Sequence, residues 1–475
     1  MKGLRLLDWT GENIPCTVLE TISEHLPDLR LLVHIHLTRT RPLRALQTHD
    51  DTILHRLRQS ANLYALEVEL IYTRAADCSA FMALLKDVLL SSRALRKLRL
   101  DVHMPQGGCC IFETPTEYHG LGFTGDERLP ALEELEIRDY PFGQIELPGA
   151  THQSGIESTK DYPADINERE YWADRFDWSA LKRLATSNLD LAIQMTPHLT
   201  ALQEVSLEVR GHLRDLEYFF YELPTTLESI AVLTHHLPDV FHVNHHGATL
   251  RKLSVRVMEA YRRPWSEGCM LPEDLRWLAL ECPLLQELEI CLNRKDEDWP
   301  FAELDILSRL PALQKVKIWF ELDEKEKKCP TPYVTFSTAT MLFRYIKSRV
   351  PPLREVVVCS GAVSHPGHGL IDEEAFWGFE NSTSYECKLS ERDDEAAHDL
   401  TTCTTVSDEQ NQWMQAQEGQ PSSLPKAMQE MTFEALAQQH ASPRSGWDFA
   451  FEVAWRGPLT LQDWVQLGYP TKRNV

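Results

Sequence analysis

The sequence has no long apolar segment. No run of about 18 apolar residues, the length needed to cross a bilayer, occurs in the 475 residues. The first residues, MKGLRLLDWTGENIPC, have too short an apolar run before Asp8 to form a signal peptide. The 11 cysteines are an odd number without regular spacing, which favours reduced thiols over a disulfide framework. We therefore expect a protein of the cytoplasm, the nucleus or both.

Positive charge is also scarce. The chain has 48 Lys and Arg against 71 Asp and Glu, a formal net charge of −23. Nucleic-acid binders gain affinity from basic surfaces that neutralise phosphates and release counterions, so this balance excludes them as a class. An anionic membrane surface is disfavoured for the same reason. With 43% hydrophobic residues the chain can still bury a large core, which is typical of a globular protein.

The usual catalytic motifs are missing. The sequence has no GxxxxGK(S/T), GxSxG, HExxH or CxxC, so P-loop, hydrolase, zinc-protease and thioredoxin chemistry have no anchor. GLGFTG, Gly120 to Gly125, matches GxGxxG, but no strand leads into it and DERLP follows in place of a helix. We interpret it as a glycine-rich loop. The prediction is a non-enzymatic protein with no catalytic residue and no cofactor.

Histidines are concentrated in one segment, THHLPDVFHVNHHG. Neutral imidazoles at this density can bind zinc, but no nearby cysteine or helical HExxH frame fixes a geometry. We expect a loop histidine cluster with no metal, and zinc binding is the alternative. The histidines concerned are His235, His236, His242, His245 and His246.

One phrase recurs along most of the chain. LPALEELEI near Leu132 returns as LPALQKVKI near Leu313, and both match Leu-x-x-(Leu/Ile/Val)-x-apolar. Successive matches are roughly 32 residues apart, an internal repeat of irregular period. Nine clear matches start at Leu63, Leu95, Leu132, Leu202, Leu227, Leu250, Leu285, Leu313 and Leu353, and three weaker ones at Leu4, Leu29 and Leu181.

Many of these phrases follow a segment of helical periodicity and a break. Phe81, Leu84, Leu85 and Val88 recur at three and four, and prolines such as Pro283 separate helix from phrase. Repeated helix–strand units give parallel strands that must stack to bury their apolar faces. The predicted fold is α/β: a leucine-rich-repeat solenoid (horseshoe) with a parallel concave sheet and outer helices, plus a partly disordered C-terminal region.

Charges on the predicted strands change sign from one repeat to the next. Alternation along a strand points Leu135 and Ile137 inward and Glu134 and Glu136 outward. Equivalent positions on neighbouring strands lie about 4.8 Å apart, so opposite charges would meet there. We predict that this face binds a protein partner through Lys97, Arg99, Glu134, Glu136, Lys252, Arg256, Glu287, Glu289, Lys315, Lys317 and Trp319.

Trp319 is the one aromatic residue in this set. Tryptophan is enriched among residues that carry binding energy, so an outward Trp319 is a candidate hot spot. The alternative is that its ring packs beneath a loop or the tail.

The predicted domain organisation has three parts. The solenoid covers 1–360, with long polar loops near 103–128 and 139–176. Residues 361–440 form an acidic, polar and partly disordered linker. In 441–475, DFAFEVAWRG alternates apolar and other residues as a strand does, and we expect it to cap the solenoid.

The phrases CPLLQELEI, LPALEELEI and LPALQKVKI resemble the irregular leucine-rich repeats that follow the F-box in many fungal F-box proteins. The resemblance covers residues 1–360, with no F-box before the first repeat in this chain. It implies a substrate-recognition subunit of an SCF-type (cullin) ubiquitin ligase, with Skp and cullin as partners. The sequence thus leaves two functions open: a protein–protein interaction scaffold, which we favour, and a ligase subunit whose F-box is lost or missing from the gene model.

Overall fold

A computed structural model describes two compact units, Met1–Leu227 and Glu228–Val475. The boundary falls inside the single solenoid predicted over 1–360. The structure describes residues 4–10, 14–37, 53–58, 60–71, 75–103, 120–123, 125, 127–140, 142, 168–209, 213–235, 237, 245–257, 265–294, 298–322, 330–361, 382–389 and 402–404.

The first unit alternates helices and strands. Each of its strands pairs in parallel with the next in sequence order. The strands are β1 (Leu6–Trp9), β2 (Arg30–Leu37), β3 (Leu63–Ile71), β4 (Lys97–His103), β5 (Glu134–Arg138), β6 (Arg183–Thr186) and β7 (Glu204–Val209). The helices are α1 (Cys16–His25), α3 (Ile53–Leu57), α4 (Ala75–Ser91), α5 (Glu168–Arg175), α6 (Leu189–Met195), the 3-10 helix η1 (Thr196–His198) and α7 (Leu213–Glu222).

The second unit begins in the same way and ends differently. Strands β8 to β12 are parallel, whereas β13 runs antiparallel to β12 and β14 antiparallel to β13. The strands are β8 (Ser229–Thr234), β9 (Lys252–Val257), β10 (Glu287–Cys291), β11 (Lys315–Phe320), β12 (Glu355–Ser360), β13 (Thr383–Lys388) and β14 (Thr402–Thr404). The helices are η3 (Trp265–Gly268), α8 (Pro272–Glu281), α9 (Phe301–Ile306), η4 (Leu307–Arg309) and α10 (Phe336–Arg349).

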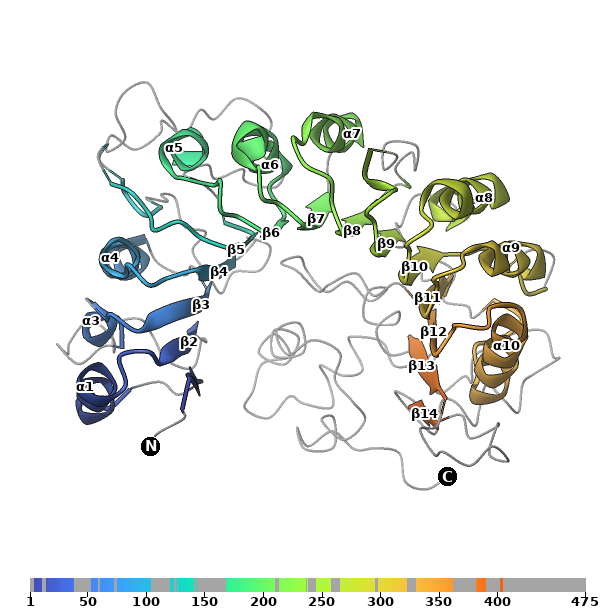
Figure 1. The fold of residues 1–475 in the computed structure, drawn as a ribbon, viewed down its shortest axis with the longest axis horizontal. Helices are drawn as coiled ribbons and strands as arrows, with labels where there is room; N and C mark the ends of the chain where they lie inside the picture. Colours follow the sequence, from blue (N-terminus) through green and yellow to red (C-terminus); the bar gives the residue numbers. More distant parts are fainter. Residues whose placement is uncertain are drawn as a thin grey trace, which may run out of the picture. The chain divides into compact units, whose positions relative to one another are not determined.

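The repeated phrase explains the strands. Each of the twelve matches leads into one of β1 to β12, and its first leucine is at most 3% exposed in every repeat except the first, where Leu4 is 46% exposed. Side chains then alternate between the core and the opposite face, as in Leu135 and Ile137 of β5, each 1% exposed. In each unit the labelled helices lie on one side of the strands (Figure 1). The predicted α/β leucine-rich-repeat fold is therefore confirmed.

The helix ends also repeat. In three repeats the backbone N–H after the last helical residue donates to the carbonyl four residues back, and a proline follows at once. Proline has no N–H and cannot continue the helix, so it ends each helix at an equivalent position. The three pairs are Leu26 with Ile22, Cys282 with Leu278 and Val350 with Ile346, followed by Pro27, Pro283 and Pro351.

Asn62 ties β3 to the preceding repeat. Its side chain is 4% exposed, and its Nδ2 donates to the carbonyls of Leu26, Pro27 and Leu29 at 3.2, 3.0 and 3.0 Å. These carbonyls belong to the turn between α1 and β2. A buried amide thus adds a donor to three backbone carbonyls of the turn, of which that of Leu26 also accepts from Leu29 N.

Two elements differ from the sequence-based expectation. Helix α5 lies inside the predicted loop 139–176, where Tyr171 and Trp172 are buried. Strand β13 lies inside the predicted linker 361–440, because TSYECK alternates and buries Tyr385 and Cys387. The predicted cap in 441–475 and the rest of that linker, apart from β14, lie outside the described residues. No helix in the described ranges is long and apolar enough to span a bilayer.

Candidate protein-binding face of the sheet

The candidate site is the sheet face opposite the core, which we call the polar face. It is made of the side chains that alternate with the buried ones along each strand. In the first unit its ionisable members are Asp8, His34, His36, Glu67, Glu69, Lys97, Arg99, Asp101, Glu134, Glu136, Arg138, Arg183, Glu204 and Glu208. In the second unit they are Lys252, Arg256, Glu287, Glu289, Lys315, Lys317, Glu355, Glu386 and Lys388.

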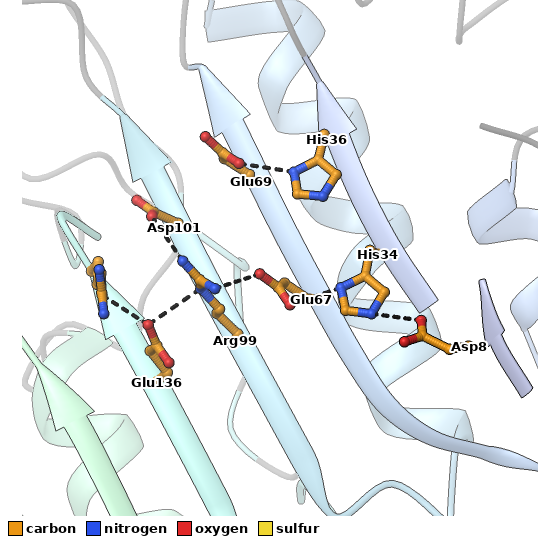
Figure 2. Close-up of polar contacts among 9 residues, drawn as sticks. Asp8, His34, His36, Glu67, Glu69, Arg99, Asp101 and Glu136 are labelled. Carbon is orange, nitrogen blue, oxygen red and sulfur yellow. Dashed lines mark hydrogen bonds and ion pairs between the residues drawn. The ribbon is translucent and has the colours of Figure 1, made fainter. Parts of the chain in front are cut away.

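Arg99 is the centre of the network in the first unit (Figure 2). The strand register sets Arg99 between Glu67 of β3 and Glu136 of β5. Its Nη1 lies 2.5 Å from Glu67 Oε1 and its Nε 3.3 Å from Glu136 Oε1. Arg138 Nε approaches the same Glu136 oxygen at 2.8 Å. Charges therefore alternate across three strands and hold one another in fixed positions.

Asp101 interrupts the alternation. The register places it beside Glu69 on β3, so two carboxylates are neighbours. Each has another polar neighbour: His36 Nδ1 lies 2.8 Å from Glu69 Oε2, and Arg99 Nη2 lies 4.0 Å from Asp101 Oδ2. The first unit thus contains a departure from the predicted sign change, compensated by groups along and across the strands.

The first outward positions of β4 to β7 carry two isolated ion pairs. Lys97 Nζ lies 2.5 Å from Glu134 Oε1, and Arg183 Nε lies 3.9 Å from Glu204 Oε2. All four side chains are more than one third exposed, so solvent screens them. Each such pair contributes roughly 0.2 to 1 kcal/mol. These pairs stabilise the fold little, and their main effect is to fix the pattern of charge on the polar face.

The second unit repeats the pattern across five strands. Lys252, Glu287, Lys315, Glu355 and Lys388 occupy equivalent positions on β9 to β13. Lys252 Nζ lies 2.9 Å from Glu287 Oε1, Lys315 forms an ion pair with Glu355, and Lys388 Nζ lies 3.5 Å from the other Glu355 oxygen. The predicted register of Glu287 and Glu289 between the strands of Lys252 and Lys315 is confirmed.

Glu289 is a partly buried carboxylate of the polar face with three polar partners. Lys317 Nζ lies 3.0 Å from it, Trp319 Nε1 donates to its Oε1 at 2.7 Å, and Ser254 Oγ donates to its Oε2 at 2.7 Å. Burial favours the neutral acid, but the Lys317 charge and these hydrogen bonds outweigh it and hold the pKa below its usual value. Glu289 is therefore a stable anion that orders three neighbouring side chains.

Trp319 faces outward, as predicted, but is only 8% exposed. The Arg256 guanidinium carbon lies 4.1 Å from its ring centroid and Lys317 Nζ lies 4.6 Å from it. The ring also belongs to a buried cluster with Val257, Trp265, Cys269, Cys291, Val357 and Cys359. The ring of Trp319 is thus packed among neighbouring side chains, and any binding role for it remains a prediction.

The sequence placed all eleven predicted residues on the strands where the structure has them. The structure joins Lys97 to Glu134, Arg99 to Glu136, Lys252 to Glu287 and Lys317 to Glu289. Arg256 lies against the ring of Trp319, two strands away. Their role in binding a partner remains a prediction.

Sequence reasoning missed the start of the network. His34 lies between two carboxylates, with Nδ1 2.8 Å from Glu67 Oε2 and Nε2 2.9 Å from Asp8 Oδ1 (Figure 2). The phrase beginning at Leu29 matches the repeat weakly, and histidine carries no fixed sign in a charge pattern. The sequence does alternate His34 and His36 with the apolar residues Val33 and Ile35, and this alternation could have placed both histidines on the polar face.

The start of GLGFTG contacts Glu168 of α5, and its described residues form no helix or strand, in agreement with its interpretation as a loop. Gly120 has φ +57°, and a Cβ there would overlap the Glu168 carboxylate. Glu168 is 1% exposed, accepts from Leu121 N at 3.1 Å and from Tyr140 Oη at 2.6 Å. The glycine is needed for this close approach and for its backbone conformation.

The remaining candidates have no metal-binding arrangement among the residues that the structure describes. Of the histidine segment, His236 and His242 lie outside those residues, and His246 is fully buried. Burial raises the pKa of the Cys282 thiol to about 12 and that of Cys359 to about 11. Both thiols are therefore protonated at neutral pH and are poor nucleophiles.

Comparisons with known proteins give a structural likeness and no match in sequence. No protein-family model matches the chain, and no curated protein matches it in sequence. The crystal structure of the leucine-rich repeat-containing protein LegL7 from Legionella pneumophila is similar over 77% of this chain and 94% of that one, with 11% identity and a TM-score of 0.34.

Proposed function

We propose that the protein is a non-enzymatic scaffold that binds a protein partner through the polar face. The observation that carries this proposal is the set of ion pairs between adjacent strands, such as Lys97 with Glu134 and Lys315 with Glu355. They hold long charged side chains in defined positions on a sheet face that faces away from the helices (Figure 1).

Fixed side chains favour association. Ordering a free lysine or glutamate on binding costs roughly 0.5 to 1.5 kcal/mol for each side chain. On the polar face much of that order exists before a partner arrives, because many of its charged side chains already pair with a neighbour of opposite sign. The pattern of signs then discriminates between partners, since like charges placed against one another are strongly unfavourable.

Exchanging the two members of an ion pair tests the proposal. Lys315→Glu with Glu355→Lys, and Lys97→Glu with Glu134→Lys, keep an ion pair in place but invert the charge pattern that a partner meets. The matched control exchanges Asp305 and Arg349, which pair at 2.6 Å between α9 and α10 on the helical side. Either polar-face exchange sets the new side chains beside like charges, namely Glu287 and Lys388 for the first pair and Arg183 for the second, so a small loss of stability is expected. Thermal unfolding of all three double variants checks that each one folds.

The readout is quantitative affinity purification from the native cell, with mass spectrometry and cross-linking. A genuine partner is expected to cross-link to the polar face, to be depleted roughly tenfold or more by a polar-face exchange, and to be retained by the Asp305/Arg349 exchange. Partners retained by both polar-face exchanges and lost with the control would place binding on the helices and refute the proposal.

A link to a ubiquitin ligase remains a prediction from the sequence resemblance alone. Its test is direct: the full chain is mixed with a Skp adaptor and cullin, and the complex is sought by size-exclusion chromatography. Absence of a complex would leave the scaffold proposal intact and remove the ligase function.

A further inference from the structure

His34 occupies a bridging position on the polar face of the first unit. It lies on β2, and its two ring nitrogens approach carboxylates on the two neighbouring strands: Asp8 of β1 at 2.9 Å and Glu67 of β3 at 2.8 Å (Figure 2). The His34 side chain is 23% exposed, and its buried Nε2 atom makes a close contact with Asp8 that lacks the alignment of a hydrogen bond. A single imidazole therefore connects three strands.

The chemistry of imidazole makes this bridge depend on protonation. A neutral imidazole has one N–H donor and one lone pair, whereas imidazolium has two donors. Ionised carboxylates are acceptors only. The charged ring therefore attracts both carboxylates, Glu67 through a hydrogen bond and Asp8 through its charge. In the neutral ring one nitrogen lone pair must face a carboxylate oxygen, and that contact becomes repulsive.

The neighbouring charges decide which contact is lost. Glu67 has a second cation, since Arg99 Nη1 lies 2.5 Å from its other oxygen. On β2 itself, His36 stacks beside His34 with centroids 6.4 Å apart and pairs with Glu69. Asp8, the group that faces His34 from β1, has a side chain 56% exposed. Loss of the His34 proton therefore weakens chiefly the contact with Asp8.

Strand β1 is attached with little help from packing. None of its residues is buried, and Leu6 is 51% exposed. In β2, by contrast, Leu31, Val33 and Ile35 are at most 5% exposed. Backbone pairing with β2 and the Asp8–His34 contact therefore carry a large share of the attachment.

We propose that protonation of His34 controls how firmly β1 is held on the sheet. The strand is firmly attached when His34 is charged and loosens when the ring becomes neutral. Because a neutral ring no longer attracts Asp8 by charge, the loosening is expected as the pH rises and His34 loses its proton. The inference concerns the sheet itself and is independent of what the polar face binds.

Hydrogen–deuterium exchange of the full chain at about pH 5.5 and about pH 8 tests the proposal over this range. Rates are corrected for the intrinsic effect of pH, and the amides of Leu6–Trp9 are compared with those of β5. We expect the protection of β1 to fall by about two- to fivefold at the higher pH, as loss of a partly exposed ion pair implies. Nitrogen-15 NMR should show both His34 nitrogens protonated at the lower pH.

Two histidine variants separate the bridge from general effects. His34→Gln cannot become charged, so protection of β1 should be equal at the two pH values. His36→Gln is the matched control, because His36 lies on the same strand and pairs with Glu69, and it should keep the pH response of the wild type. Unchanged protection of β5 and β10 verifies that both variants fold.

The proposal is overturned if protection of β1 in the wild type does not change with pH, or if His34→Gln keeps the change. It is equally overturned if NMR shows a neutral His34 at the lower pH. Asp8→Asn provides a second variant should His34→Gln fail to fold, and it too should remove the pH response.

Discussion

Gly120 and Glu168 occupy one space: the Glu168 carboxylate lies where a side chain at position 120 would begin. Replacing Gly120 with Ala should lower the free energy of unfolding by about 1 to 3 kcal/mol, through steric overlap and a positive φ. Gly122→Ala is the control, because Gly122 has φ +61° but nothing within 4 Å of the added carbon. Urea denaturation of both variants checks this. Equal losses would show that backbone conformation alone matters at Gly120.

Asn62 should be among the most sensitive polar residues of the first unit. Asn62→Ala removes the side-chain donor from the carbonyls of Pro27 and Leu29, and leaves that of Leu26 with Leu29 N alone, which should cost about 1 to 3 kcal/mol. Asn293→Ala, at a half-buried asparagine, is the comparison and should cost less than about 1 kcal/mol. Chemical denaturation monitored by circular dichroism measures both. Similar losses at the two positions would contradict the role assigned to Asn62.

Glu289 should contribute to acid sensitivity. Its pKa in the folded protein is lower than the value of 4.5 for a free side chain, so its stabilisation is present above pH 4.5 and is lost as the pH falls through the folded value. Glu289→Gln should therefore show a smaller decrease in unfolding free energy on acidification than the wild type. The comparison is Glu287→Gln, on the same strand but with a more exposed side chain. An unchanged acid response in Glu289→Gln would refute the prediction.

The cysteines should differ sharply in reactivity. With pKa values of about 12 and about 11, Cys282 and Cys359 hold almost no thiolate at pH 8 and are also buried. We expect iodoacetamide to label them roughly 100-fold or more slowly than exposed Cys16. Mass spectrometry of the labelled peptides gives the rates, and labelling in denaturant is the control. Rapid native labelling of Cys282 would contradict the burial that the structure shows.

The sequence predicts the fold well because one local pattern repeats. Alternation around residues such as Leu288 and Val316 fixes which side chains enter the core, and the same register sets Glu287 beside Lys315. This information is contained within a few residues of each strand. The parallel strands and the charge pattern of the candidate site follow from it.

The contacts that the sequence did not predict join segments outside the repeat or residues of variable charge. Glu168 contacts Gly120 and Tyr140, which are distant from it in sequence and lie outside the repeated phrase. Trp319 occupies the predicted outward position, yet its burial depends on Trp265 and Cys269 from another segment. Strand β13 runs antiparallel to β12 and does not match the repeated phrase, so the repeat could not predict their pairing.

The sign alternation also constrains how this protein can have evolved. Removing the single repeat that contains β10 would bring Lys252 of β9 next to Lys315 of β11, two like charges at one position of the sheet. Removing two consecutive repeats would restore an opposite neighbour, since Lys252 would then meet Glu355. At these positions of the second unit, opposite charges therefore stay adjacent only when an even number of repeats is gained or lost. The ion pairs thus favour changes of two repeats over changes of one.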